Sequence, residues 1–275
     1  MEHRLALLPD RGVVEITGPD RVSFLQGLVS NDVALAGPGQ SVWAALLTPQ
    51  GKWIFDFFIR ADGERLLLDV QRTAAAAVIQ RLSRFRLRAQ VALRDLGPAL
   101  NVYAAWGELT AFAPEALVAA DPRLPRAGWR IFSATPLNAT ATAEDWERHR
   151  IELGLPSAAD LESEKSVLLE AGFDELNGIS WSKGCYMGQE LTARTRYRGL
   201  VKRRLVPVAI DGPLPPPGTP VTRDGVEVGT MRSGAGGIGL AQLRLEALGA
   251  SVLECGAARV APRPPAWMRL PATAE

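Results

Sequence analysis

Apolar runs alternate with turn residues over the first hundred positions of the chain. Three runs, at 41–47, 53–59 and 65–70, are separated by the turn signals Thr48–Gly51 and Ala61–Gly63. Runs of this length between such signals predict an antiparallel β-meander. Strand-like composition recurs in four further segments, at 13–16, 88–95, 100–106 and 129–133.

Helical spacing interrupts this strand pattern. Val22, Leu25 and Leu28 recur at helical intervals and predict a helix over 19–28. Good helix formers with an apolar stripe predict a second helix over 73–85. These helices and the meander together indicate a mixed α and β region.

A third helix, expected over 143–153, has the clearest boundaries. Thr142 can cap its N-terminus, and Asp145 stands three residues on, as in a capping box. Gly154 and Pro156 follow and are typical of a helix end. Local sequence therefore defines both ends of this helix.

From Lys202 onward, the chain changes to short β-branched runs between turns rich in Gly and Pro. Asp224-Gly225 is a strong hairpin signal, and the pattern predicts a small β-barrel or sandwich. The expected strands lie at 203–210, 219–223, 226–232 and 251–260, with the glycines of 234–239 as punctuation. We therefore divide the chain into a mixed region at 1–200, a C-terminal barrel at 201–262 and a Pro-rich tail at 263–275.

Composition restricts the class of protein. The chain has 275 residues, is 47% hydrophobic and has a formal net charge of +1. It can therefore bury a large core, and its bulk charge predicts neither a nucleic-acid binder nor a membrane binder, although a local patch can still be either. Cys185 and Cys255 are too few for a disulfide framework and fit a reducing compartment. Met1–Gly12 resembles neither a signal nor a transit peptide, so a cytoplasmic location is expected.

The stretch Lys183-Gly184-Cys185-Tyr186-Met187-Gly188-Gln189-Glu190 is the most informative in the chain. Its two inner glycines bracket an aromatic residue and a thiol, which implies a tight loop that another group approaches closely. Because Gln189–Thr195 is expected to be helical, Cys185 would stand near a helix N-terminus and beside Lys183. Both neighbours favour the thiolate. The alternative is that Cys185 is a small buried hydrophobe.

A basic run overlaps this loop. Residues 183–204 contain seven Lys or Arg and one acid, Glu190. Most such runs are solvated faces, but the interleaved tyrosines and the Gly-rich loop favour an anionic ligand, either a polyglutamyl tail or an RNA backbone. A second arginine set would extend this surface if it lay on the same face, which the sequence does not decide: Arg81, Arg84, Arg86 and Arg88.

Other chemistries have little support. His3 and His149 are the only histidines, and neither lies near a motif. Two Cys and two His spread along the chain do not resemble a structural zinc site, and one chain cannot supply four thiolates to an iron–sulfur cluster. No metal ligands are therefore predicted. The glycines of 234–239 also do not follow the G-x-G-x-x-G pattern of a nucleotide site.

The stretch 183–190 is similar to the K-G-C-[FYW]-x-G-Q-E signature of the YgfZ family, whose members are folate-binding relatives of the glycine-cleavage T protein. Mitochondrial iron–sulfur assembly factors of the same type belong with them. Other segments resemble further landmarks of the family: Phe24–Val33 for F-L-Q-G-x-x-x-N-D-V, Gly51–Asp56 for its G-[KR] hairpin, Arg150–Pro156 for R-I-x-x-G-x-P, and Arg198-Gly199 and Leu240–Arg244 for its later positions.

This resemblance implies an α+β fold of the T-protein type. The fold is a cloverleaf of mixed α/β subdomains around a central folate channel, with a C-terminal antiparallel β-barrel. Residues 1–200 would then form the folate-binding region, and tetrahydrofolate, with or without a polyglutamyl tail, would be the cofactor. The implied role is support of the biogenesis or repair of iron–sulfur enzymes, with an indirect effect on tRNA thiomodification. An accessory role is favoured over a catalysed reaction. Folate and iron–sulfur enzymes or assembly proteins are the expected partners of a monomer that binds neither tRNA directly nor a membrane.

The resemblance also indicates site residues. Trp146 stands where a bacterial relative has a folate-contacting tryptophan, whereas a second such tryptophan falls on Arg11 here. Cys185 is the candidate reactive thiol, with Lys183 beside it. The expected cofactor contacts come from the matched segments and are Trp146, Asn31, Asp32, Asp56, Tyr186, Gln189, Glu190 and Arg198.

Glycine cleavage is the alternative function. T proteins carry two acids in the hairpin that follows the glycine, and one of them assists aminomethyl transfer. The corresponding positions here are Phe55 and Asp56, so a single acid remains. Aminomethyl transfer to tetrahydrofolate is therefore the second interpretation. An RNA-binding module is a third, which the nearly balanced charge disfavours.

Overall fold

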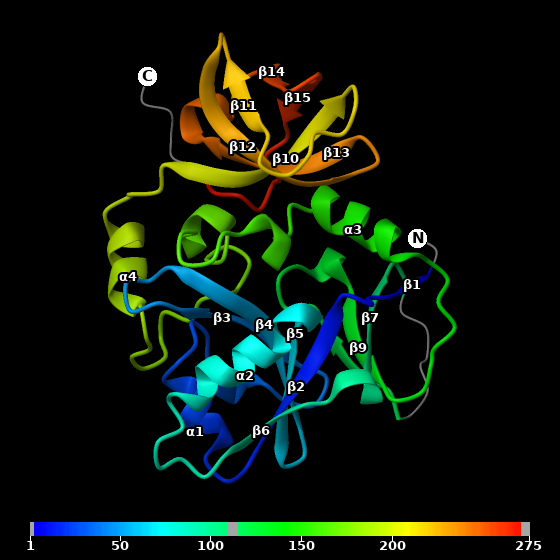
Figure 1. The fold of residues 1–275 in the computed structure, drawn as a ribbon, viewed down its shortest axis with the longest axis vertical. Helices are drawn as coiled ribbons and strands as arrows, with labels where there is room; N and C mark the ends of the chain where they lie inside the picture. Colours follow the sequence, from blue (N-terminus) through cyan, green and yellow to red (C-terminus); the bar gives the residue numbers. More distant parts are fainter. Residues whose placement is uncertain (1–2, 109–114, 271–275) are drawn as a thin grey trace.

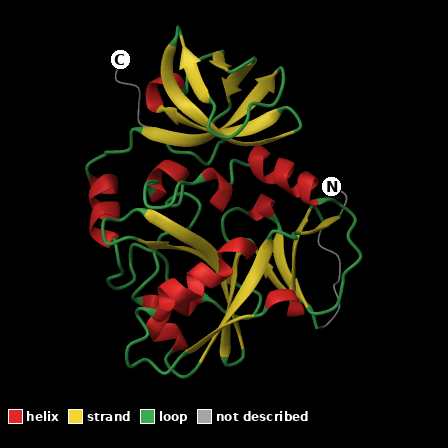
Figure 2. Ribbon diagram, in the orientation of Figure 1, coloured by secondary structure: helices red, strands yellow, loops and turns green. Residues whose placement is uncertain are grey.

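The computed structural model describes residues 3–108 and 115–270. Two antiparallel sheets occupy one end of the molecule and a closed barrel occupies the other (Figure 1). Short helices lie over the sheets and in the layer between the sheets and the barrel (Figure 2). The mixed α and β fold with a C-terminal barrel is therefore confirmed.

The first sheet contains the predicted meander. Its strand order is β3-β4-β5-β2-β6, and all its pairings are antiparallel. The apolar runs at 41–47, 53–59 and 65–70 coincide with β3, β4 and β5. The strands are β2 (Arg11–Thr17), β3 (Ser41–Leu47), β4 (Trp53–Asp62), β5 (Arg65–Gln71) and β6 (Ala92–Asp95). The strand expected at 88–95 is shorter than predicted, because its pairing with β2 begins only at Ala92.

Helices α1 (Arg21–Gln26) and α2 (Ala75–Ser83) pack against this sheet through one apolar cluster. The stripe predicted for α2 is correct, since Val78 and Leu82 are buried in that cluster. Helix α1 is shorter than expected, and Val22 on the predicted stripe is exposed. The reason is that the short helix packs through Phe24 and Leu25 instead.

The second sheet has the order β1-β7-β9-β8. Its strands are β1 (Arg4–Leu7), β7 (Asn101–Trp106), β8 (Leu117–Ala120) and β9 (Trp129–Ser133). Strand β1 was not predicted, because its four residues have no alternating pattern and it is held by pairing with the distant β7. Helix α3 (Ala143–Glu152) packs beside β1, and the capping box of Thr142 and Asp145 is present as predicted.

The C-terminal barrel closes in the order β10-β13-β12-β11-β14-β15. Its strands are β10 (Arg203–Asp211), β11 (Pro220–Arg223), β12 (Val226–Ala235), β13 (Ile238–Arg244), β14 (Leu253–Cys255) and β15 (Ala258–Pro262). Strand β13 was missed, because the glycine cluster looked like a loop. Gly236 and Gly237 have φ angles of 55° and 83° and form only the tight turn into β13. The strand expected at 251–260 is two strands joined by a turn at Gly256.

Two further features join the barrel to the rest of the chain. Helix α4 (Gln189–Tyr197) lies at the edge of the molecule, shortly before β10 (Figure 1). After the last strand the chain returns, and Trp267 donates from Nε1 to the carbonyl of Leu153 at 2.8 Å. The same ring packs against the barrel core and against the cluster under β3 and β4. The barrel is thereby fixed above the layer that contains α3.

Candidate functional site

A central cavity of about 530 Å³ lies where the two sheets, α3 and the barrel meet. Strands β2, β4 and β9 contribute its floor, and the β12–β13 hairpin contributes Gly234 and Gly236. Cavities of this size are typical of small-molecule sites. The sequence-predicted residues that line it are Trp146 and Asp56. Arg11, which stands in place of a relative's second tryptophan, also lines it, together with the cationic residues Arg123, Arg130 and Arg150.

Asp56 is a buried carboxylate in the floor of this cavity. The indole Nε1 atoms of Trp43 and Trp53 donate to its two oxygens at 2.9 and 3.2 Å. Burial raises the pKa of Asp56, and this outweighs the opposing hydrogen bonds and the charges of Arg11 and Arg123. A buried, rigidly held carboxyl can pair with the N–H groups of a planar heterocycle. Asp56 also lines a smaller apolar cavity of about 210 Å³ on its other side.

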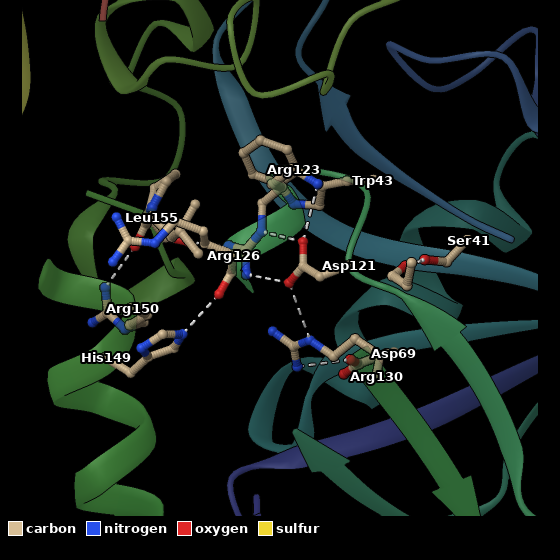
Figure 3. Close-up of polar contacts among 12 residues, drawn as sticks. Ser41, Trp43, Asp69, Asp121, Arg123, Arg126, Arg130, His149, Arg150 and Leu155 are labelled. Atoms are coloured by element: carbon tan, nitrogen blue, oxygen red, sulfur yellow. Dashed lines mark hydrogen bonds and ion pairs between the residues drawn. The ribbon is translucent and has the colours of Figure 1, made fainter. Parts of the chain in front are cut away.

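A chain of alternating buried charges lies along one wall of the cavity, and Figure 3 shows the part that runs from Arg123 through Asp121 and Arg130 to Asp69. Arg11 donates from Nε to Asp69 at 2.6 Å, and Arg130 donates to the second oxygen of Asp69 at 3.1 Å. Arg130 Nε also stands 3.7 Å from Asp121, to which Arg123 donates at 2.7 and 3.0 Å. The two aspartates thus join three arginines from different elements.

Electrostatics within this chain favour the ionised pairs. Burial tends to raise the pKa of Asp121, but the charge and hydrogen bonds of Arg123 and the charge of Arg130 outweigh it, so that the pKa is lowered. Burial lowers the pKa of Arg130 to about 10, against the attraction of Asp69. Three guanidinium groups therefore face the cavity with two aspartates behind them. The wall can receive an anionic or electron-rich group.

Aromatic rings support the guanidinium groups. Arg123 and Arg130 lie 4.9 and 4.2 Å from the ring centroid of Phe58, and Arg130 also lies 5.3 Å from that of Trp146. Trp146 is 5% exposed and packs on Trp106 at a centroid distance of 5.6 Å. Trp146 therefore lines the cavity and also belongs to the buried core.

The barrel is connected to the cavity through Arg150. This residue of α3 pairs with Glu147 and donates to Asp160 at 2.8 Å. Asp160 also accepts the hydroxyl of Ser233, from β12, at 2.5 Å. Asp69, Asp121, Arg123, Arg130 and Asp160 were missed by sequence reasoning. The available signal was a charged residue inside an apolar strand, as in Asp69 of β5 and Arg130 of β9.

Lys183 lies away from the central cavity. Its ammonium group donates to the carbonyl oxygens of Gln26, Val29 and Asn31 at 2.6, 2.8 and 2.7 Å. Burial lowers the pKa of Lys183 to about 8, against the charge of Asp32. All three ammonium hydrogens are therefore used to hold the segment after α1. Lys183 thus ties the loop 183–190 to the backbone of the segment 24–33.

The rest of the loop 183–190 is divided between core and surface. Tyr186 is buried, and burial raises its pKa to about 12. Cys185 is exposed, three residues before Gly188, which caps α4 with a φ of 84°. Within the described part of the chain, the lining of the central cavity includes no residue of 183–204.

The other predicted contacts also lie outside the central cavity. Asn31 donates to the carbonyl oxygens of Trp43 and Asn177, and it lines a wider cavity of about 760 Å³ beside Trp181. The remaining residues are placed as follows: Asp32 caps the turn Val33–Leu35, Gln189 begins α4, exposed Glu190 pairs with Arg194 at 2.5 Å, and Arg198 is an exposed residue at the end of α4.

The basic run is likewise dispersed. Arg196 pairs with Asp174 at 3.6 Å and stacks on Trp181 at 4.2 Å, and Arg204 pairs with Glu175 at 2.6 Å. These cations are therefore committed to contacts around α4 and the start of the barrel. The structure brings Asp56, Trp146 and Arg11 together in one cavity, and it places Lys183, Cys185 and Arg198 elsewhere.

Comparison with known proteins agrees with this architecture. The chain superimposes on the aminomethyltransferase T of the glycine cleavage system from Bartonella henselae with a TM-score of 0.74, over 98% of this chain and 87% of that one, at 15% identity. This likeness shows the T-protein-like fold. Residues 202–270 match the family described as the C-terminal beta-barrel domain of CAF17.

Sequence relatives are more specific. The mitochondrial iron–sulfur cluster assembly factors IBA57 of Mus musculus and Homo sapiens are 31% and 32% identical, over 88% and 86% of this chain and 77% and 76% of their own lengths. The mitochondrial homolog of Mycosarcoma maydis is 36% identical over 78% of this chain, which spans 59% of that relative.

These relatives correct one expectation. The cytoplasmic location expected from the sequence is contradicted, because the matched relatives are mitochondrial proteins by name. Unpaired cysteines fit any reducing compartment, so composition did not distinguish between them. Among the residues that the structure describes, no helix is long and apolar enough to cross a membrane. By its identity to the mouse and human proteins over most of both sequences, the chain belongs to the IBA57 family of iron–sulfur cluster assembly factors.

Proposed function

We propose that this protein binds tetrahydrofolate in the central cavity and thereby supports the biogenesis or repair of iron–sulfur enzymes. The observation that carries the proposal is the meeting of Asp56, Trp146 and the guanidinium groups of Arg11 and Arg130 around one cavity. A pterin ring offers N–H groups for a carboxyl and a flat face for an aromatic ring. The T-protein-like fold supports the folate part of the proposal, and the relatives' names support the iron–sulfur part.

The cavity residues fit the group in size and chemistry. A volume of about 530 Å³ is adequate for a ligand of folate size. Arg130 Nε is buried and lies at ion-pair distance from Asp121, 3.7 Å, but it has no hydrogen-bond acceptor among the described residues. In this proposal, a folate carboxylate or a polyglutamyl tail reaches the arginines that line the cavity. It does not reach the basic run at 194–204. Bound folate would supply a one-carbon carrier, and the chain's own residues would orient it and exclude water.

The role in the cell follows the YgfZ-type resemblance. The signature 183–190 and the segments 24–33 and 51–56 resemble segments of that family, and in this proposal the protein acts as an accessory factor for iron–sulfur enzymes. Altered tRNA thiomodification would then be an indirect consequence of losing such an enzyme. The expected partners are iron–sulfur enzymes or their assembly proteins, and the proposed protein works as a monomer.

Ligand titration tests the binding step. Reduced folate should give saturable binding by calorimetry and by tryptophan fluorescence. Trp146→Ala should weaken binding about two- to tenfold, because stacking adds about 0.5–1.5 kcal/mol beyond burial. Trp181→Ala is the matched control, because Trp181 lies at the other cavity. Arg198→Ala should bind both mono- and polyglutamylated folate like the wild type. No saturable binding, or a loss caused by Trp181→Ala alone, would reject the cavity as the site.

A complementation experiment tests the role. A strain without the protein, restored with wild type, Trp146→Ala or Cys185→Ala, would be assayed for several iron–sulfur enzymes, tRNA thiomodification and glycine cleavage. The wild type should restore the iron–sulfur enzymes, and glycine cleavage should be normal throughout.

Aminomethyl transfer to tetrahydrofolate is the second candidate. Asp56 favours it, because this single acid lies in the cavity of a T-protein-like fold. Loss of glycine cleavage in the same strain, restored by wild type and not by Asp56→Asn, would make this the main function.

A further inference from the structure

One exposed connection combines an apolar tip with unpaired charge. Residues 84–88, which we call the Leu87 tip, are the first part of the connection from α2 to β6, at the end of the molecule opposite the barrel (Figure 1). Leu87 is 90% exposed and has a φ of 40°. This left-handed conformation is rare for a bulky residue. An exposed leucine alone is ordinary, but here the backbone also holds the side chain away from the core in an unfavourable conformation.

The charge around the tip has one sign. Residues 70–94 contain six arginines and no Asp or Glu, in a chain whose net charge is only +1. Arg84, Arg86 and Arg88 flank the leucine, and all three are exposed. Throughout residues 3–108 and 115–270, no carboxylate forms an ion pair with any of these three.

Three acids on the sheet that contains β6 and on its connections are already engaged. The carboxylate of Asp20 accepts the backbone N–H of Gln90 at 2.7 Å, and Glu64 pairs with Arg21 at 2.8 Å. Glu15 pairs with Arg94 at 3.0 Å. The positive charge of the tip is therefore not paired with any described carboxylate, and it is available to an external anionic surface.

Against the expectation from the sequence that this protein binds no membrane, we propose that the Leu87 tip docks it reversibly on an anionic lipid surface. Leu87 enters the interface, and Arg84, Arg86 and Arg88 contact the headgroup phosphates. A nucleic acid would use the arginines but not the leucine. A protein partner would need a concave pocket around a single projecting side chain, whereas a flat lipid surface accepts a convex tip. Membrane docking by a few cations and one apolar group is weak and reversible.

This docking is independent of the proposed folate binding, because the tip and the central cavity share no residue. With the tip on a surface, the barrel faces solution at the other end of the molecule (Figure 1). The exposed Cys185 lies on a different loop and takes no part in the docking. A variant that loses lipid binding should therefore keep full affinity for folate.

Vesicle flotation tests the proposal. The full chain should float with phosphatidylcholine vesicles that contain phosphatidylglycerol, and not with pure phosphatidylcholine. Raised salt should weaken the binding. Leu87→Asn removes the apolar group with a residue that tolerates the left-handed conformation, and it should weaken partitioning about tenfold or more. The triple change Arg84→Gln, Arg86→Gln and Arg88→Gln should weaken it about a hundredfold.

Matched controls lie on the barrel. Val226→Asn alters a side chain that is 61% exposed, and the triple change Arg223→Gln, Arg244→Gln and Arg259→Gln alters net charge equally at exposed positions. Both controls should float like wild type, and Leu87→Asn should unfold at the same temperature or higher. Equal binding to neutral vesicles, or wild-type flotation of Leu87→Asn, would overturn the proposal. Tight tRNA binding that survives Leu87→Asn but not the arginine change would assign the tip to nucleic acid instead.

Discussion

Gly51 and Gly188 lie back to back, although 137 positions separate them in the sequence. A Cβ atom on Gly51 would stand 2.9 Å from the carbonyl oxygen of Gly188, and one on Gly188 would stand 3.0 Å from the Cα of Gly51. Both residues have left-handed backbones, with φ angles of 70° and 84°. Two matched segments, the hairpin 51–56 and the loop 183–190, therefore form one close backbone contact that only glycine allows.

This contact predicts the effect of two substitutions on stability. Gly51→Ala and Gly188→Ala should each lower the free energy of unfolding by about 2–4 kcal/mol, from left-handed strain and overpacking together. Gly39→Ala is the matched control, because Gly39 has a φ of 72° but open space around its Cα. Denaturant unfolding measures all three. If Gly39→Ala costs as much as Gly51→Ala, the backbone contact is unimportant.

The buried charge chain predicts a large cost for removing one member. Asp69→Asn leaves Arg11 and Arg130 without their shared carboxylate, and it should destabilise the protein by about 3–5 kcal/mol. Glu162→Gln, which breaks a pair with the exposed Lys165 and one with Arg232, should cost far less, about 1 kcal/mol. Urea unfolding of both variants provides the comparison. Similar losses in the two variants would contradict the importance of burial.

The lowered pKa of Lys183 predicts that the free energy of unfolding depends on pH. Its pKa falls from 10.5 to about 8 on burial, so between these values the unfolded chain binds more protons than the folded one. Stability contributed by this group therefore rises as pH increases from about 8 to about 10.5, by up to about 3 kcal/mol. The measurement is the difference in unfolding free energy between wild type and Lys183→Met at neutral pH and near the upper value.

The same variant separates the charge from the hydrogen bonds. Lys183→Met should be less stable than wild type at neutral pH, because the carbonyls of Gln26, Val29 and Asn31 lose their donor. The gap should then widen with rising pH. A gap that stays constant or narrows would show that the buried ammonium does not release its proton early.

The two thiols should differ in reactivity. Cys185 is exposed, whereas Cys255 is fully buried in the barrel core, and burial raises the pKa of Cys255. A small alkylating reagent should modify Cys185 at least about tenfold faster at neutral pH. Cys185→Ser should abolish the fast reaction, and Cys255→Ser should leave it unchanged. In denaturant the two rates should become similar, and a fast Cys255 in the native protein would be inconsistent with the closed barrel.

Much of the secondary structure was determined locally. The meander, the stripe of α2 and the capping box at Thr142 follow from spacing within a few residues, and they appear as predicted. The short β1 and the strand after Gly237 were missed, because both depend on pairing with a partner elsewhere in the chain. Backbone preferences act over one turn or one hairpin, so the sequence alone contains them.

The candidate site was determined only in part by sequence. Asp56 and Trp146 were identified through matched segments, but the arginine wall was not, because Asp69 and Arg130 are each a single charge inside an apolar strand. A buried charge is tolerated only when a counter-charge from another strand reaches it, and the packing of the two sheets decides which strand that is. The same packing turned Lys183 toward three carbonyls of a distant segment and left Cys185 at the surface.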